Sequence, residues 1–462
     1  MAAPGWNGAA GGPDADVLER LDDLLRRADA AGAVEADTFL VQEELQTVQV
    51  RLGTVESLKH ARENRCSLRI FTATGSASAT TSDLSPGALA RLVDETVRLA
   101  RVAERDEHSG LPDPGTLGAA APVELDLWDD AAAKLPPETK IEWARRAEAA
   151  ALEADPRVRN SEGAEFYDRR AQVAYASSGG FRGRFRVSSF ALSVTPVAVD
   201  DGHMERDYWY TSARHLADLE SPEAVGREAA RRAVRRLGAR KGRTTEVPVV
   251  FDPETAASLV RSLAVAVSGP SLYRGTSFLI GQRERRVGSD LVTIVDDPLM
   301  VRGLGSRPFD GEGIPSRRTV VVDRGMLRNY LLDTYSARRL GLEATGHAAR
   351  EDGGGITVGY TNLYLEPGSW APEDIVGSVD RGLYVTELIG FGVNFTTGDY
   401  SRGAVGFWIE EGELTYPVEE ITVAGNLRQM LQDVEMVGRD LAFRDQTAAP
   451  TVKIARMTVA GQ

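Results

Sequence analysis

The sequence contains a single cysteine, Cys66, among 462 residues. No disulfide can form within such a chain, and neither can a zinc site that needs two of its own thiolates. The fold must therefore be held together by a buried hydrophobic core, and a chain of this length can bury a large one. The cysteine count leaves the redox compartment open and is compatible with the cytosol.

Composition and charge narrow the class of protein. Hydrophobic residues make up 42% and charged residues 26%, proportions typical of soluble globular proteins. The net charge of −14 argues against nonspecific nucleic-acid binding, which needs Lys and Arg to neutralise phosphates. The longest apolar runs, such as Leu263 to Val267, are far shorter than the roughly 20 residues of a membrane-spanning helix. We therefore expect neither a nucleic acid nor a membrane as partner.

The first 240 residues are predicted to form two units of helix plus sheet. Residues 1–15 are rich in Gly, Ala and Pro and lack the pattern of a secretory signal, so we expect a disordered tail and a cytoplasmic protein. The first unit, residues 16–108, combines an amphipathic helix, strand-like runs at 38–41, 46–52 and 67–73, and a helix that Ser85-Pro86 begins. A linker at 109–122 leads to the second unit, residues 123–240, with helices near 138–154 and 221–237 and a turn at 177–180.

Residues 241–462 are predicted to form a strand-rich C-terminal domain. Hairpin signals stand at Asp323-Arg324-Gly325 and at 410–413, and a buried strand is expected at 247–251. Few helices are expected, and the clearest two are at 253–268 and 426–436. The predicted fold class is therefore α+β, with an N-terminal mixed α/β region followed by this domain.

One helix carries a strongly basic face. Its arginines are Arg227, Arg231, Arg232, Arg235 and Arg236, with Arg240 just beyond. A nucleic-acid surface is one interpretation, but the acidic chain around it favours a solvated helix face.

Searches for known catalytic motifs find none. The sequence has no phosphate-binding loop, no nucleophile elbow, no dinucleotide fingerprint and no H-E-x-x-H helix. The five histidines, His60, His108, His203, His215 and His347, never recur at helical spacing. Cys66 has no nearby histidine and is interpreted as buried or inert rather than nucleophilic. Glycine-dense segments at 390–395 and 396–403 fit either ligand approach or ordinary turns.

Several long C-terminal motifs nevertheless occur in a characteristic order. They are Arg274-Gly275-Thr276-Ser277-Phe278, the segments 334–342 and 362–368, Thr345-Gly346-His347, Thr397-Gly398-Asp399-Tyr400-Ser401-Arg402-Gly403 and the segment 421–427, with Met204-Glu205-Arg206-Asp207-Tyr208 upstream. In order and spacing the chain resembles the TldD/PmbA family of bacterial proteases, also called modulators of DNA gyrase, from about Asp16 to the C-terminus.

The resemblance also points to one branch of that family. The TldD branch carries H-E-x-x-x-H on the first helix of the C-terminal domain and a zinc-ligating cysteine near the chain end. Counted without gaps, the two histidine positions fall at Val260 and Val265, the acid at Arg261 and the cysteine at Val437. Valine has no lone pair for zinc, and arginine cannot accept a proton from a metal-bound water. The chain is therefore similar to the PmbA (TldE) branch, which lacks the metal.

The resemblance implies a non-catalytic subunit of a heterodimeric zinc metalloprotease acting on unfolded or precursor polypeptide. No cofactor is then expected in this chain, and zinc is expected on a TldD-type partner. An extended peptide could be held by addition to a sheet edge. Candidates for the cleft or the subunit interface are Arg274, Gly275, Thr276, Ser277, His347, Thr397, Gly398, Asp399, Tyr400, Ser401, Arg402 and Gly403. Two alternatives stay open, a stand-alone peptide-maturation hydrolase and a regulatory binding protein of the gyrase-modulator type.

Overall fold

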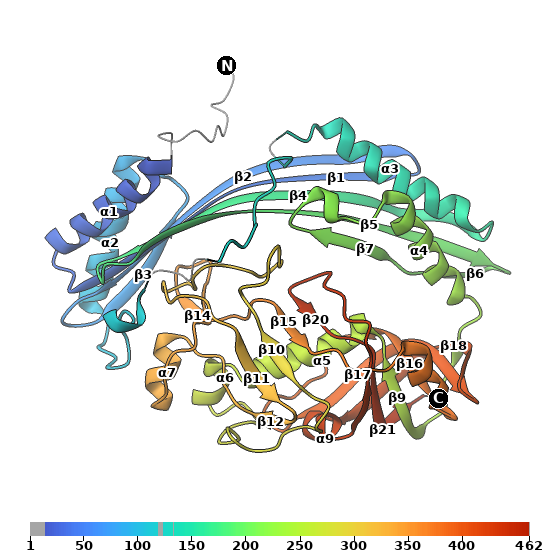
Figure 1. Cartoon of the computed structure of the whole chain (residues 1–462). Helices are drawn as coiled ribbons and strands as arrows, with labels where there is room; N and C mark the ends of the chain where they lie inside the picture. The colour runs from blue at the N-terminus through green and yellow to red at the C-terminus, as the bar shows by residue number, and fades with distance from the viewer. Residues whose placement is uncertain (1–13, 119–122, 133, 462) are drawn as a thin grey trace.

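A computed structural model describes residues 14–118, 123–132 and 134–461 of the chain. A long sheet from the N-terminal half arches over a strand-rich C-terminal domain (Figure 1). This arrangement confirms the expected fold class. Most of the predicted tail, residues 1–13, and residues 119–122 of the predicted linker lie outside the described residues.

The two predicted N-terminal units share a single sheet, ordered β3-β2-β1-β4-β5-β6, with β7 also paired to β5. Its strands are β1 (Glu35–Arg51), β2 (Thr54–Phe71), β3 (Ser76–Thr81), β4 (Val158–Ser177), β5 (Arg182–Asp200), β6 (His203–Arg206) and β7 (Trp209–Ala213). The runs predicted at 38–41 and 46–52 are one strand, because the polar residues between them continue the pairing with β2.

Both helix pairs cover the same face of this sheet. They are α1 (Asp14–Ala30) with α2 (Pro86–Val102), and α3 (Pro137–Ala154) with α4 (Pro222–Arg235). Side chains alternate between the faces of a strand, and on β1 the even-numbered Leu40 packs with α1 and α2 while Val48 packs with α3 and α4. Odd-numbered residues such as Asp37 therefore face the C-terminal domain.

The C-terminal domain contains two larger sheets and one small one. One has the order β12-β11-β10-β15-β20, the other β19-β21-β9-β16-β17-β18-β8, and β13 pairs with β14. The strands are β8 (Arg240–Lys241), β9 (Thr245–Phe251), β10 (Ile294–Asp296), β11 (Thr319–Asp323), β12 (Met326–Leu327), β13 (Ala348–Arg350), β14 (Ile356–Val358), β15 (Leu363–Leu365), β16 (Arg381–Ile389), β17 (Asp399–Glu410), β18 (Glu413–Asn426), β19 (Val434–Val437), β20 (Thr447–Ala448) and β21 (Val452–Ala460).

Short helices connect these strands. They are α5 (Pro253–Ala266), α6 (Gly269–Tyr273), α7 (Thr334–Leu340), α8 (Pro372–Gly377) and α9 (Leu427–Gln432). Helix α5 packs against β9, β15, β16 and β20, so it touches strands of both larger sheets. The helix predicted at 426–436 ends four residues early, because Val434, Met436 and Val437 pair with β21 instead. Among the described residues, no helix is long and apolar enough to cross a membrane.

A buried ion cluster centred on Asp37 joins the long sheet to the C-terminal domain. The Asp37 carboxylate accepts a hydrogen bond of 3.0 Å from Arg69 and lies 2.8 Å from the guanidinium of Arg350, which belongs to β13. Arg69 also contacts Glu312 at 3.1 Å, and Tyr175 donates to Asp37 at 3.1 Å. Burial alone would raise the pKa of Asp37, but Arg350 and Arg69 lower it to about 2.

The arginines at the end of α4 make a second junction. The predicted solvated face is correct for Arg227, Arg231 and Arg240, which are exposed, and is wrong for Arg232, Arg235 and Arg236. Arg232 is buried and lies 3.3 Å from Asp207. Arg236 donates to Glu387 of β16 at 2.6 Å, and the Arg235 guanidinium lies over the ring of Phe407. Asp207 of the N-terminal half compensates the burial of Arg232, whereas Glu387 and Phe407 of the C-terminal domain compensate that of Arg236 and Arg235.

We predict that Asp37→Asn destabilises the folded protein by about 3 kcal/mol, because two buried guanidinium groups lose their shared charge partner. The free energy of urea unfolding at pH 7 measures this loss. The lowered pKa of Asp37 also means that its contribution is present above about pH 4 and is lost as the pH falls toward 2. Because Asp37→Asn has no carboxylate at this position, its free energy of unfolding should fall less than that of the parent between about pH 4 and pH 2.

The matched control is Asp23→Asn, which removes an exposed carboxylate paired with Arg27 on α1. It should cost less than about 1 kcal/mol. Equal losses in the two variants would contradict the role given to the buried cluster.

Candidate functional site

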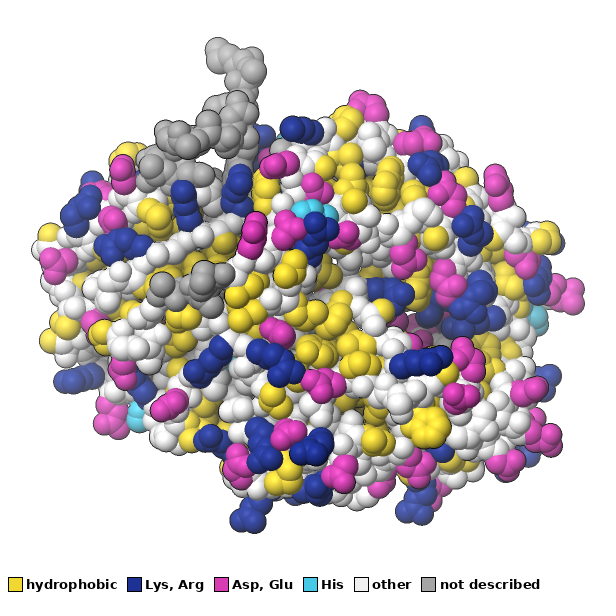
Figure 2. Space-filling view, in the orientation of Figure 1, with side chains coloured by type: hydrophobic (Ala, Val, Ile, Leu, Met, Phe, Trp, Pro, Cys, Tyr) yellow, Lys and Arg dark blue, Asp and Glu magenta, His cyan; other side chains and the backbone are white. Residues whose placement is uncertain are grey.

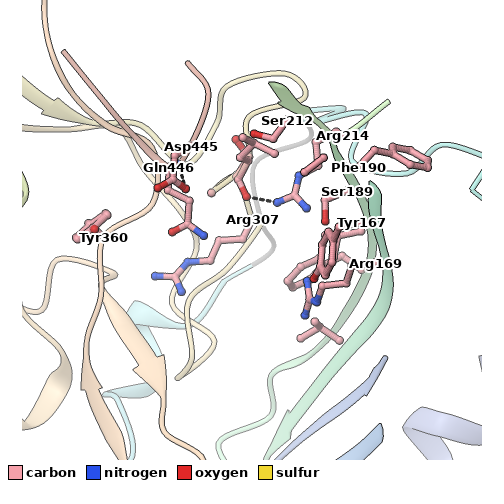
Figure 3. A pocket seen from close by; sticks show the side chains of 17 residues that line it. Tyr167, Arg169, Ser189, Phe190, Ser212, Arg214, Arg307, Tyr360, Asp445 and Gln446 are labelled. Atoms are coloured by element: carbon pink, nitrogen blue, oxygen red, sulfur yellow. Dashed lines mark hydrogen bonds between the residues drawn. The ribbon is translucent and has the colours of Figure 1, made fainter. Parts of the chain in front are cut away.

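A cavity of about 500 Å³ lies between the long sheet and the C-terminal domain (Figure 3). We call it the interdomain cavity. In the space-filling view, apolar side chains gather between the two halves of this face and charged side chains surround them (Figure 2). The cavity is lined by Tyr167, Arg169, Val173, Phe185, Val187, Ser189, Phe190, Ala191, Ser212, Arg214, Leu304, Gly305, Ser306, Arg307, Tyr360, Asp445 and Gln446.

The alternation of β4 and β5 explains which sheet residues reach the cavity. Even-numbered Phe166 and Leu192 are buried with α3 and α4 on the opposite face. Odd-numbered Tyr167, Ser189 and Ala191 line the cavity. Across from them, Figure 3 shows Arg307, Tyr360 and Gln446 on segments of the C-terminal domain. The cavity is thus shaped jointly by the two halves of the chain.

Its charge is predominantly positive. Arg169, Arg214 and Arg307 line it, against one carboxylate, Asp445. Arg169 is paired with Glu43 at 2.7 Å. Arg214 is buried and donates to the carbonyl oxygens of residues 188, 303 and 304. Burial and the neighbouring Arg169 lower the pKa of Arg214 to about 10, so it remains a cation at neutral pH.

A second cavity of about 730 Å³ lies beside α5, and Asp445 lines both. We call it the α5 cavity. It is lined by Asp207, Tyr208, Tyr210, Glu254, Thr255, Ser258, Arg261, Ser262, Val265, Thr386, Glu387, Leu388, Gly390, Phe391, Val393, Phe395, Arg402 and Asp445. Two apolar side chains of this lining are exposed, since Phe391 is fully exposed and Val265 is 41% exposed.

The α5 cavity contains two of the three positions that the resemblance assigns to the metal motif. Arg261 and Val265 line it, whereas Val260 is buried in the core. Among the described residues, no group of three or more His, Cys, Asp and Glu side chains is arranged to hold a metal ion. The residues present on α5 therefore do not fit a catalytic zinc.

The ungapped count placed the cysteine position at Val437. Val437 lies in β19, paired with Val452 of β21, and is buried in the same hydrophobic core as Val260 of α5. Its valine side chain offers no ligand to a zinc ion.

The predicted segment Arg274 to Ser277 forms a turn after α6. Gly275 has φ +76°, the left-handed conformation that favours glycine. Ser277 is buried and donates to the carbonyl of Ala266, so it closes the turn against the end of α5. Arg274 and Thr276 are exposed, and none of the four lines either cavity.

His347 is buried in a hydrogen-bond network rather than in a cleft. Its Nε2 lies 3.1 Å from Asp296, and its Nδ1 lies 2.8 Å from the Thr345 hydroxyl. Asp296 also accepts from the backbone and hydroxyl of Thr361. Burial would raise the pKa of Asp296, but His347 and Thr361 lower it. The network holds β10 to the segments before β13 and β15, which is a structural role.

In the glycine-dense segment 397–403, only Arg402 reaches a cavity. Asp399 is exposed and accepts hydrogen bonds from Thr397 and Asn426, which ties the turn to β18. Tyr400 is buried, and burial raises its pKa to about 12 against the effect of Arg402. Gly398, Ser401 and Gly403 line neither cavity.

Most cavity residues were not predicted from the sequence. Arg169, Arg214, Arg307 and Asp445 stand in no recognisable motif, and strands far apart in the sequence bring them together. The odd-numbered polar residues of β4 and β5 were the available signal. Cys66 is buried, and burial raises the pKa of its thiol to about 11, in agreement with an inert cysteine.

Comparison with known families gives three consecutive matches. The PmbA/TldA metallopeptidase domain 1 matches residues 36–100, the central domain matches 130–237, and the C-terminal domain matches 244–461. The chain is 39% identical over 416 residues to Metalloprotease PmbA of Escherichia coli O157:H7, covering 90% of each. It is 35% identical over 415 residues to a PmbA homolog of Haemophilus influenzae, again covering 90% of each.

Solved structures share the fold. A candidate modulator of DNA gyrase from Bacteroides thetaiotaomicron has a TM-score of 0.89 and 27% identity, covering 96% of this chain and 98% of that chain. TldE of Thermococcus kodakarensis has a TM-score of 0.86 over 96% of this chain and 100% of its own, at 23% identity.

We predict that His347→Ala lowers the free energy of unfolding by about 2–4 kcal/mol, because it leaves the buried Asp296 carboxylate short of a partner. Thermal and urea unfolding measure the loss. The control His203→Ala, at an exposed position on β6, should cost less than about 0.5 kcal/mol.

Polypeptide affinity of the folded His347→Ala variant should stay within twofold of the parent. A loss of polypeptide affinity without a loss of stability would instead support the prediction that His347 lines the cleft.

Proposed function

Because the chain belongs to the PmbA/TldA metallopeptidase family, we propose that it is the metal-free subunit of a two-subunit peptidase. It contributes the cleft in which an unfolded or precursor polypeptide is held, and a TldD-type partner supplies the zinc and cuts the chain. The observation that carries this proposal is the lining of the α5 cavity, which presents Arg261 and Val265 where a catalytic subunit would present its metal motif.

The two cavities support the substrate part of the proposal. They adjoin at Asp445 and lie where the long sheet faces the C-terminal domain, so an extended chain could pass from one to the other. Their walls combine apolar side chains such as Phe391 and Val173 with hydrogen-bonding groups such as Ser189. Such a lining suits an extended polypeptide, because its backbone offers hydrogen-bonding groups at regular intervals whatever its side chains are.

Two other functions make different predictions. A stand-alone hydrolase would retain a stoichiometric metal after dialysis, which elemental analysis of the purified chain detects. A regulatory protein of the gyrase-modulator type would form a stable complex with its target without a TldD-type partner. The acidic net charge of −14 makes direct DNA binding the weakest form of that function.

The proposal predicts the outcome of a peptidase assay on an unfolded substrate. The isolated chain, the TldD-type subunit and their mixture are incubated with an unfolded polypeptide, with and without a zinc chelator. The mixture should cleave at least tenfold faster than the isolated chain, and the chelator should abolish that rate. Zinc-dependent cleavage by the isolated chain at the rate of the mixture would contradict the non-catalytic role.

A cavity-filling variant tests the cleft itself. Ala191→Trp places an indole in the interdomain cavity, and we expect at least a tenfold loss of affinity for an unfolded polypeptide, measured by fluorescence anisotropy. The control Lys59→Trp, at an exposed position on β2 of the same sheet that lines neither cavity, should leave the affinity within twofold. Equal affinities for the two variants would place the substrate elsewhere.

A further inference from the structure

The interdomain cavity holds more positive charge than the chain itself compensates. Of its three arginines, Arg169 has a carboxylate partner in Glu43. Arg214 is buried and bonds only to backbone carbonyls. Arg307 has no side-chain hydrogen bond to any described residue, and its Nε and Nη2 atoms are buried.

No carboxylate near Arg307 forms a hydrogen bond with it. Burial lowers the pKa of Arg307, and the negative charges of Asp310 and Asp296 oppose that effect without direct contact. The oxygens of Asp296 are taken by His347 and Thr361. Those of Asp310 accept from the backbone amides of residues 312, 314 and 348. The Arg307 guanidinium thus retains donors that the described residues leave unused.

An unused guanidinium of this kind is an anion-binding group. Burying a cation without a hydrogen-bonded counter-charge is unfavourable, and an incoming anion offsets that cost. The planar guanidinium fork matches the two oxygens of a carboxylate, with shorter and stronger bonds than a neutral pair makes. Hydroxyl groups of Tyr167 and Ser189 line the same cavity on the sheet side and offer further hydrogen-bond donors there (Figure 3).

The two arginines come from opposite walls of the cavity. Arg214 follows β7 on the sheet side, and Arg307 belongs to the segment between β10 and β11 of the C-terminal domain (Figure 3). In Figure 3 the Arg307 guanidinium points toward Gln446, whereas that of Arg214 is turned to the carbonyl oxygens of residues 303 and 304. A bulky bound polyanion would also meet Asp445, which lines the same cavity and opposes an excess of negative charge.

We propose that the interdomain cavity is an oxyanion site that receives a carboxylate of the bound polypeptide, with Arg307 as its recognition residue and Arg214 as a second positive charge in the lining. The carboxylate is an acidic side chain or the C-terminus of the substrate. That the carboxylate comes from a polypeptide rests on the proposed function. That the cavity binds an anion rests only on the charges of its lining. It assigns acidic polypeptides as the preferred class of substrate, although the protein as a whole is acidic.

The test compares peptides that differ only in charge. Three fluorescent unfolded peptides of one length are used, an acidic peptide with a free C-terminus, its amidated form, and an amidated form with Gln and Asn in place of Glu and Asp. Affinities are measured for the full chain and for Arg307→Gln, which removes the charge without removing a hydrogen bond made by the described residues. The control Arg456→Gln removes an exposed arginine of β21 whose partner is Glu246.

The parent should bind the acidic peptide about tenfold more tightly than the neutral one, a factor expected for one charge-assisted pair. Arg307→Gln should abolish this preference and leave neutral-peptide affinity within twofold, whereas Arg456→Gln should change neither. Asp445→Asn keeps the oxygen that accepts from the Gln446 amide and should strengthen acidic-peptide binding severalfold. Circular dichroism confirms that each variant is folded.

Equal affinity of the parent for acidic and neutral peptides overturns the inference while leaving the proposed cleft intact. A further arm separates the sources of the anion, since a ligand that binds only the folded state raises the melting temperature. If phosphate or acetate stabilises the parent but not Arg307→Gln, and peptide charge has no effect, the site takes a free anion and the peptide carboxylate is rejected. If no peptide binds at all, the proposed function fails, and the acetate arm still reports on the anion site.

Discussion

The contact between the Asp37 carboxylate and two arginines fixes how the halves of this protein lie against each other. Arg69 reaches Asp37 from the neighbouring strand and Arg350 reaches it from the C-terminal domain. Glu312 extends the cluster and accepts the backbone amide of Thr334 at the start of α7. Charges this deeply buried are tolerated only when each is paired. The cluster therefore sets the separation of sheet and domain, and with it the space that remains between them.

The two cavities follow from that separation and from the period of the strands. Apolar even-numbered residues of β1, β4 and β5 pack under the helices, which leaves the odd-numbered residues, polar and apolar, facing the C-terminal domain. The arginines of α4 hold the other end of the sheet through Asp207, Glu387 and Phe407. At this end Glu387 and Phe407 lie across the junction, whereas Asp207 belongs to the N-terminal half itself. The interdomain cavity lies beneath the sheet between the two anchored ends.

Local signals in the sequence predicted the elements better than their assembly. Helices α2 and α5 each begin with a capping side chain followed by proline, at Ser85-Pro86 and Asp252-Pro253. The tight turn between β17 and β18 is formed by Glu411-Gly412, both with positive φ. The single sheet shared by both N-terminal units was not predicted, because the pairing of β1 with β4 joins residues more than 100 positions apart. The motif residues His347 and Ser277 are buried and hydrogen-bonded within the C-terminal domain, and the cavity arginines lie in no motif.

The family relationship and the chemistry of α5 together describe a peptidase fold whose own helix offers no metal ligands at the motif positions. The feature left to explain its function is the pair of cavities beneath the long sheet. Hydrogen–deuterium exchange of the isolated chain, with and without a saturating unfolded polypeptide, tests this claim most directly. The account predicts slowed exchange in the segments that border the cavities, residues 186–192, 303–307, 386–395 and 444–447. Protection confined to other surfaces, or absent from these segments at saturation, would contradict it.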